Sequence, residues 1–173
     1  MLKLNYHIIL ASNSPRRREL LSGLGLDYEV RTLPGIDESY PETLQGEEIP
    51  VYISSQKASA YLDELKENEL LITADTIVWL DGRVLGKPSD EEDACQMLRA
   101  LSGKTHQVIT GVTLATTTFS IQHYNSRHVI TPYLKLLLGI CESVDHPQIV
   151  RIVCANSCLL HSLYLTRSRS LQT

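Results

Sequence analysis

The sequence predicts an α/β fold, because apolar runs typical of strands alternate with segments of helical periodicity. The first run, Ile8–Leu10, leads directly into a helix pattern. The second, Leu70–Leu80, is nearly continuous, as in a strand that is buried on both faces. With 173 residues, the chain is long enough for one domain, or a small two-lobed one, with a substantial core. We therefore expect a sheet with flanking helices.

The first predicted helix begins directly after the first strand. Ser14 stands at the N-cap, Pro15 follows at the first helical position, and Gly25 is suited to end the helix. The apolar stripe of this helix consists of Leu20, Leu21 and Leu24. The stretch therefore predicts a strand, a tight turn and a helix, with polar side chains at the junction.

Three consecutive arginines, Arg16–Arg18, occupy the first turn of that helix, where the helix dipole disfavours cations. Such a local misfit is typical of a functional position. Their guanidinium groups, the free N–H groups of the helix N-terminus and the hydroxyls of Ser12 and Ser14 would together bind a polyanion, most simply phosphate. A solvated basic cluster on a surface helix is the alternative.

Acidic residues follow the next predicted strand. Residues 26–32 alternate between apolar and polar side chains, and Pro34-Gly35 ends the pattern. Asp37 and Glu38 then lie in a loop. They could supply turn chemistry, which the sequence slightly favours, or their carboxylates could hold a divalent metal.

A helix is predicted from about Pro50 to Leu65. Its apolar stripe consists of Val51, Ala58, Leu62 and Leu65. Lys57 falls inside this otherwise small and apolar segment. A lone lysine there usually extends to water, but it would contact phosphate if it pointed into a cleft.

Asp75 interrupts the long apolar run. A carboxylate in a buried strand is costly unless it is paired, bound to metal or open to an active-site cleft. The hydroxyls of Thr73 or Thr76 could satisfy it, which would make it structural. We favour a functional role, because buried acids cluster at functional sites.

The elements after this strand follow from local signals. Asp81-Gly82 predicts a hairpin turn, and Ser89 or Asp90 caps a helix with an acidic first turn that Gly103 ends. Residues 106–118, which are apolar and rich in threonine, predict another strand in the same sheet as Asp75.

Composition excludes several classes of protein. The net charge of −4 makes the arginine cluster local and argues against a general nucleic-acid binder. Residues 1–7 do not form the apolar core of a signal peptide, and no apolar run is long enough to span a membrane. The four cysteines lack a dense framework pattern, so we expect reduced thiols and a cytoplasmic protein.

The chain changes character near residue 120. Acidic residues predominate before it, and basic residues, histidines and cysteines are enriched after it. We therefore divide the chain into residues 1–119 and an atypical segment, residues 120–173. Residues 133–140 and 149–165 could each be a strand or a buried helix. Cys154, Cys158 and His161 have a spacing that a metal could use, although core cysteines are the commoner case.

Six short motifs in residues 7–119 occur in an order that resembles the Maf family of nucleoside triphosphate pyrophosphatases. They are Ser12-Asn13-Ser14-Pro15-Arg16-Arg17, Gly35-Ile36-Asp37-Glu38, Gln56-Lys57-Ala58, Thr73-Ala74-Asp75-Thr76, Gly86-Lys87-Pro88 and Leu101-Ser102-Gly103-Lys104-Thr105-His106.

The resemblance implies a mixed, elongated sheet with flanking helices and a deep cleft between two lobes, as in Maf and inosine triphosphate pyrophosphatase-like proteins. It implies metal-dependent hydrolysis of a nucleoside triphosphate to the monophosphate and pyrophosphate, with Mg²⁺ or Mn²⁺, and allows a homodimer. Asp75 matches the general base, and Glu38 would help it hold the metal. The positions that would bind substrate are Ser12, Arg16, Arg17, Lys57, Thr76 and Lys87. With Arg16 and Thr76 at these two positions, the chain is similar to the subfamily that acts on dTTP and UTP.

We picture the arginines holding the triphosphate while Asp75 faces it across a groove, so that the carboxylate orients the attacking water and the cations stabilise charge on phosphate oxygens. Residues 120–173 do not match the family's last motif, which carries a glutamine that helps select the base. A shifted reading frame or an unrelated replacement would explain this, and a divergent tail is the alternative. A catalytically inactive nucleotide-binding or cell-division regulatory protein is therefore the second functional hypothesis.

Overall fold

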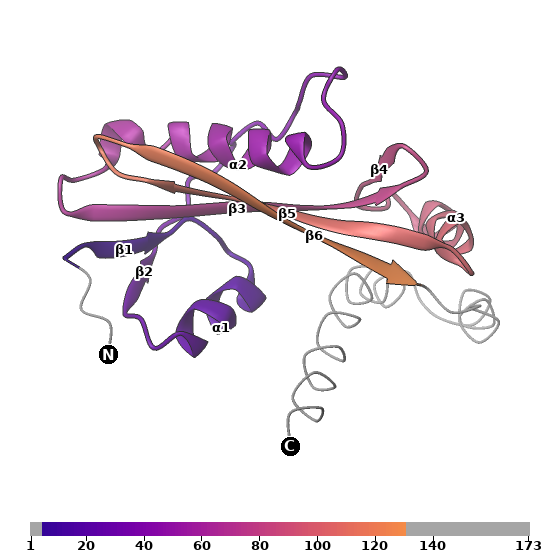
Figure 1. Cartoon of the computed structure of the whole chain (residues 1–173), viewed down its shortest axis with the longest axis horizontal. Coiled ribbons are helices and arrows are strands. Elements are labelled where there is room, and N and C mark those ends of the chain that lie inside the picture. The colour runs from indigo at the N-terminus through magenta and orange to yellow at the C-terminus, as the bar shows by residue number, and fades with distance from the viewer. Residues whose placement is uncertain (1–4, 131–173) are drawn as a thin grey trace. The chain divides into compact units, whose positions relative to one another are not determined.

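A computed structural model describes residues 5–130 of the chain. Within this range the elements are β1 (His7–Leu10), α1 (Pro15–Gly23), β2 (Tyr28–Val30), α2 (Glu48–Ser59), a short 3₁₀ helix η1 (Leu62–Glu64), β3 (Glu69–Leu80), β4 (Arg83–Leu85), α3 (Glu91–Leu101), β5 (Thr105–Ala115) and β6 (Ser120–Ile130) (Figure 1). Apart from the consecutive strands β3 and β4, strands alternate with helices up to β5, so the predicted α/β class is confirmed.

The strands form one mixed sheet in the order β2-β1-β3-β5-β6, and β4 pairs with β3. β1 runs parallel to both of its neighbours, with Leu10 opposite Val30 on β2 and Ile72 on β3. β4 runs antiparallel to the end of β3. The described residues divide into two compact units, one containing residues 5–76 and 109–126 and one containing residues 77–108 and 127–130. The strands β3, β5 and β6 contribute residues to both.

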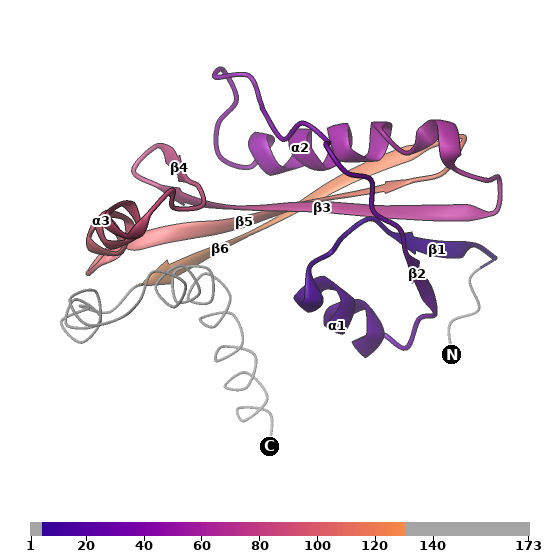
Figure 2. The ribbon, with the colours of Figure 1, turned by 180° about the vertical axis from the view of Figure 1, so that it is seen from behind.

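In the first unit, α1 and α2 lie on opposite faces of the sheet (Figures 1 and 2). Because successive strand residues point to opposite faces, β1 serves both helices. Ile9 packs with Ala58 of α2, while Ile8 and Leu10 pack with Leu21 of α1. This double burial explains why β1 is a continuous apolar run.

The ends of α1 are as predicted, but its apolar stripe is narrower. Ser14 is the N-cap residue, Pro15 begins the helix, and Gly25 follows its end with a φ of +68°. Leu20 and Leu24 are exposed, however, and only Leu21 is buried. Successive residues of a helix are 100° apart around its axis. The face of α1 that packs Leu21 against the sheet therefore leaves Leu20 and Leu24 outside the contact.

The second helix is also shorter than predicted. α2 ends at Ser59, and the segment to Leu65 continues as η1, with Leu62 exposed and Leu65 buried. The periodicity of the sequence does not distinguish the α-helix from the tighter turn that follows it. Val51 is half-buried and Ala58 is buried, as the predicted stripe required.

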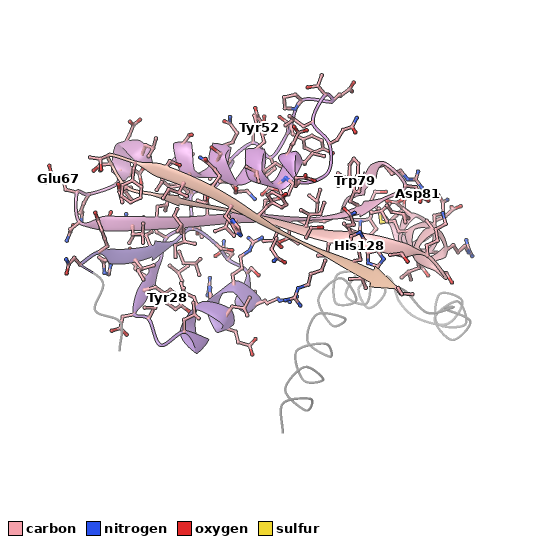
Figure 3. All side chains as sticks on the ribbon, viewed as in Figure 1. Tyr28, Tyr52, Glu67, Trp79, Asp81 and His128 are labelled. Atoms are coloured by element: carbon pink, nitrogen blue, oxygen red, sulfur yellow. The ribbon has the colours of Figure 1, made fainter. Side chains whose placement is uncertain are left out.

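The second unit contains the predicted hairpin and the capped helix. Asp81 and Gly82 have φ values of +50° and +80°, the left-handed pair that a two-residue turn between antiparallel strands requires. Figure 3 shows Asp81 in this turn and Trp79 on the strand before it. Of the two predicted caps, Asp90 is the one used, and its side chain accepts a 2.8 Å hydrogen bond from the N–H of Asp93.

Replacing Asp90 by alanine should lower the free energy of unfolding by about 1 kcal/mol, because an N–H at the start of α3 loses its acceptor. Asp90→Asn is the matched control, since it keeps an acceptor oxygen and should cost less. Urea denaturation followed by the fluorescence of Trp79, the single tryptophan of the chain, measures both. Equal stabilities for the alanine and asparagine variants would contradict the capping role.

The end of the described chain contains a strand that the sequence did not predict. β6 follows β5 through a tight loop, in which the N–H of Thr116 donates to the carbonyl of Phe119. Nearly all residues of β6 are exposed. A strand that buries neither face carries no alternating apolar pattern, so its sequence gives no signal.

Three further expectations concern the cysteines, the last part of the chain and membrane spans. Cys95, which is buried on α3, is disulfide-bonded, whereas we expected reduced thiols, because cysteine spacing does not show which cysteines meet. Residues 133–140, residues 149–165 and the Cys154, Cys158 and His161 group lie outside the described residues. Among the helices of residues 5–130, none is both long and apolar enough to cross a membrane.

Candidate active site

Lys57 of α2 lies between two carboxylates. Its Nζ is 2.8 Å from Oδ1 of Asp75 on β3 and 2.9 Å from Oε1 of Glu38. The side chains of Lys57 and Asp75 are only 13% and 14% exposed, whereas that of Glu38 is 57% exposed. The lysine therefore does not extend to water as the structural alternative required.

The pairing also answers the question of what satisfies Asp75. The hydroxyl of Thr73 donates to the carbonyl of Ser54, and the hydroxyl of Thr76 lies against that of Thr110. Neither hydrogen bond involves Asp75, whose carboxylate bonds to Lys57 instead. An acid paired with a lysine on a buried strand is the arrangement that lets a charge persist there.

The two acids of the loop after β2 have different contacts. Asp37 accepts hydrogen bonds from the backbone N–H and the hydroxyl of Ser39, at 2.9 and 2.7 Å. These two bonds lower the pKa of Asp37 below its usual value. Asp37 therefore stabilises the turn, whereas Glu38 forms an ion pair with Lys57. The turn alternative thus applies to Asp37, whereas the role of Glu38 in holding a metal stays a prediction.

Arg17 of α1 belongs to a second set of polar contacts. Its Nη1 donates to Oγ of Ser12 at 3.2 Å, and its Nη2 donates to Oγ1 of Thr76 at 3.4 Å. Ser12 is buried and also accepts from the N–H of Ser14. Arg16 and Arg17 are both half-buried at the start of α1. The turn after β1 and the first turn of α1 thus point an arginine at the middle of β3.

Asp75 and Thr76 are successive residues of β3, so their side chains lie on opposite faces of the sheet. Lys57 approaches Asp75 from the α2 face, and Arg17 approaches Thr76 from the α1 face. We expected the arginines to face Asp75 directly across a groove. The alternation of the strand places Arg17 on the opposite face from Asp75 instead.

Both sets of contacts nevertheless lie just beyond the carboxyl end of β1. The last residue of β1 is paired with Ile72, and the N–H of Ala11 still donates to the carbonyl of Ile72. β3 continues past this point to Asp75 and Thr76 without β1 beside it. In open α/β sheets, ligands bind at the carboxyl ends of strands, where side chains from both faces can reach them.

The sequence analysis missed one residue of the candidate site, Thr110, and the role of another, Lys87, stays a prediction. Thr110 of β5 contacts the hydroxyl of Thr76 at 3.0 Å, and a threonine in a threonine-rich strand gave no signal of this. Lys87 belongs to the second unit, in the loop between β4 and α3. Its role in binding substrate stays a prediction.

Side chains that could ligate a metal do not gather in large groups in the described part of the chain. Residues 5–130 contain no group of three or more histidine, cysteine, aspartate or glutamate side chains that could hold an ion. The carboxylates of Glu38 and Asp75 do converge on one positive group, Nζ of Lys57. They are the pair that could hold a divalent cation together with oxygens of a ligand.

These features define a mixed α/β protein with cationic side chains gathered around the carboxyl end of its first strand. The chain belongs to the Maf family, because the model of the family, described as Maf-like protein, matches residues 7–135. The match includes every residue of the two sets of contacts described above, and it includes the whole of β6. The resemblance seen in the motifs is confirmed.

Bacterial relatives share this part of the chain. A dTTP/UTP pyrophosphatase from Phocaeicola vulgatus is 70% identical over 111 residues, which are 64% of this chain and 58% of the relative. One from Porphyromonas gingivalis is 52% identical over 112 residues, covering 64% and 56%. The chain thus spans a little over half the length of these relatives. Among solved structures, the Staphylococcus aureus Ham1 protein is similar with a TM-score of 0.48 and 18% identity, covering 70% of each chain.

Proposed function

We propose that the protein hydrolyses a nucleoside triphosphate to the monophosphate and pyrophosphate, and that dTTP and UTP are its substrates. The observation that carries this proposal is the Lys57–Asp75 pair at the carboxyl end of β1, in a chain whose relatives are named for this reaction. A half-buried carboxylate with a lysine beside it supplies both a proton acceptor and a positive charge in one place.

In this mechanism, water attacks the α-phosphorus and pyrophosphate leaves. Asp75 accepts the proton of the water, for which it needs to be held in a fixed orientation, and Lys57 provides that restraint. Arg16, Arg17 and Lys57 stabilise the charge that builds on the phosphate oxygens. The triphosphate would lie along the open edge of β3 beyond β1, where Arg17 and Lys57 can reach it from opposite faces.

The remaining predicted contacts complete the substrate site. Ser12 and Thr76 offer hydroxyls beside Arg17, and we propose that they orient the triphosphate. Lys87 is proposed as a further phosphate contact on the family resemblance. We propose that residues 1–119 contain the nucleotide site and that residues 120–173 are an atypical segment, whose first strand, β6, pairs with β5. On composition and net charge, we also propose a cytoplasmic location and no binding to nucleic acid or membranes. A homodimer is proposed on the family resemblance.

The residues present fit a divalent cation. Mg²⁺ is commonly held by one or two carboxylates and the phosphate oxygens of the substrate, and Mn²⁺ accepts similar oxygen ligands. Glu38 and Asp75 already converge on the ammonium of Lys57, so they fit a positive charge between them. When bound, the cation would neutralise charge on the phosphate oxygens.

A non-catalytic nucleotide-binding or cell-division regulatory role is the second candidate. It is favoured by one specific observation, the extent of the match: the aligned part covers 58% of the Phocaeicola vulgatus relative and 64% of this chain. The cations at the carboxyl end of β1 would serve binding as well as hydrolysis, so the geometry of the site is compatible with both roles.

Pyrophosphate release from a panel of nucleoside triphosphates, with Mg²⁺ and with a chelator, tests the proposal. We expect dTTP and UTP to be hydrolysed faster than the purine nucleotides, and only with the metal. Calorimetric titration with the same nucleotides accompanies the assay. Binding without turnover would select the regulatory role, and neither binding nor turnover would contradict both.

A further inference from the structure

Three fully buried residues with hydroxyl side chains lie on α2 and β3, which also carry Lys57 and Asp75, and on the neighbouring strand β5. They are Ser54 on α2, Thr73 on β3 and Thr113 on β5, and we refer to their hydroxyls as the hydroxyl cluster. The hydroxyl of Ser54 donates to the carbonyl of Val51 and lies 2.9 Å from that of Thr113. Because a hydroxyl has a single proton, Thr113 is then the donor to Ser54. The hydroxyl of Thr73 donates to the carbonyl of Ser54 at 2.7 Å.

The hydroxyl cluster and the charged pair repeat the same connection between α2 and β3. Ser54 and Lys57 are three residues apart and share one side of the helix. Thr73 and Asp75 are two residues apart and share one face of the strand. Thr73 therefore bonds to Ser54 beside the place where Asp75 bonds to Lys57. A shift of α2 along β3 would break both connections together.

The backbone of β5 approaches α2 closely at the same level. A Cβ on Gly111 would lie 2.3 Å from the carbonyl carbon of Pro50 and 2.5 Å from the N of Val51. Gly111 lies two residues from Thr113, so the two share a face of β5. The absence of a side chain at Gly111 allows α2 to approach closely enough for Ser54 to reach both strands.

We infer that the hydroxyl cluster positions Lys57 against Asp75, so that Ser54, Thr73 and Thr113 are positioning residues of the site. An apolar contact would hold α2 on the sheet with little preference for register, whereas buried hydroxyls are costly unless each finds its partner. The cluster therefore specifies one register of the helix on β3. Its consequence for turnover rests on the proposed function, but its consequence for Lys57 does not.

The matched pair Thr73→Val and Thr73→Ser tests the inference. Valine keeps the shape of Thr73 and removes its hydroxyl, whereas serine keeps the hydroxyl. We expect Thr73→Val to lower kcat about 10- to 100-fold with little change in KM, because a small displacement of reacting groups has effects of that size. Thr73→Ser should restore kcat. Thr116→Val is the control for stability, since Thr116 is also buried and all hydrogen bonds of its hydroxyl lie in the loop before β6, with the N–H groups of Thr118 and Phe119 and the hydroxyl of Thr118.

A second measurement does not require turnover. Acetylation of single lysines by acetic anhydride, resolved by mass spectrometry in the absence of nucleotide, reports how well Lys57 is held. Thr73→Val should raise the rate at Lys57 several-fold and leave the exposed Lys66 unchanged, whereas Thr73→Ser and Thr116→Val should leave both rates unchanged. If the wild type shows no turnover, the proposed function fails and the rate at Lys57 still decides the positioning role.

The inference is overturned if Thr73→Val folds with wild-type kcat and wild-type reactivity of Lys57. It is also overturned if Thr116→Val changes Lys57 as much as Thr73→Val does, because the effect would then be general loosening. If Thr73→Val does not fold, Thr113→Val and Thr113→Ser provide the same comparison, since Thr113 donates to Ser54 from β5.

Discussion

Asp75→Asn is expected to lower kcat for pyrophosphate release by about 10²- to 10⁴-fold, the usual contribution of a general base. Asparagine has the shape of aspartate and can still accept a hydrogen bond from Lys57, but it cannot take a proton from water. Lys57 also keeps Glu38 as a partner, so the fold should be retained. Steady-state kinetics with dTTP and Mg²⁺, together with a circular dichroism spectrum, measure the two effects.

Asp81→Asn is the matched control for this change. Asp81 also pairs with a lysine, Lys104, at 2.6 Å, but its side chain is 60% exposed in the turn between β3 and β4. Removing its charge should leave kcat unchanged. If pyrophosphate release persists at the wild-type rate in Asp75→Asn, Asp75 is not the base of the reaction.

Glu69→Gln should cause the largest loss of stability, about 2 to 4 kcal/mol of the free energy of unfolding. The carboxylate of Glu69 is almost fully buried at the start of β3. It accepts bonds from both terminal nitrogens of Arg31, at 3.0 and 2.8 Å, and from the N–H of Lys66. The neutral amide keeps the size of the side chain but leaves the Arg31 guanidinium without its buried counter-charge. Urea denaturation at pH 7 measures the loss.

The difference in the free energy of unfolding between the wild type and Glu69→Gln should depend on pH, and the direction of the change can be predicted. Hydrogen bonds from Arg31 lower the pKa of Glu69 from 4.5 to about 2. A carboxyl group with a depressed pKa in the folded state stabilises the protein above its unfolded pKa, and that stabilisation is lost as the pH falls toward the folded pKa. The gap in stability between wild type and Glu69→Gln should therefore shrink between about pH 4.5 and pH 2. A gap that stays constant over this range would contradict the assignment.

Glu29→Gln is the control for the ion pair. Glu29 also contacts Arg31, at 3.2 Å, but its side chain is about half exposed. Exposed ion pairs contribute little, because water already solvates both charges. The loss of stability should be clearly smaller than for Glu69→Gln.

Local signals in the sequence predicted local structure well. Asp81-Gly82 predicted the hairpin because that dipeptide readily adopts the left-handed backbone that the turn requires. Asp90 predicted the start of α3 because its side chain bonds to a backbone N–H three residues away. Such features depend on a few neighbouring residues, which the sequence contains in full.

The parts that were missed depend on residues far apart in the chain. Glu69 is charged and directly precedes an apolar run, so nothing marks it as buried until Arg31 is placed beside it. The bond between Ser54 and Thr113 joins residues 59 positions apart. The same limit applies to the candidate site. Its residue types were recognisable from the motifs, but the sequence did not show that Lys57 and Arg17 approach β3 from opposite faces.

Hydrolysis of dTTP in water labelled with ¹⁸O tests the central claim most directly, because the label marks the phosphorus that water attacks. The account predicts that the wild-type protein with Mg²⁺ places one ¹⁸O in the monophosphate and none in the pyrophosphate, as mass spectrometry of the two products would show. Label in the pyrophosphate, release of orthophosphate, or no hydrolysis would contradict it.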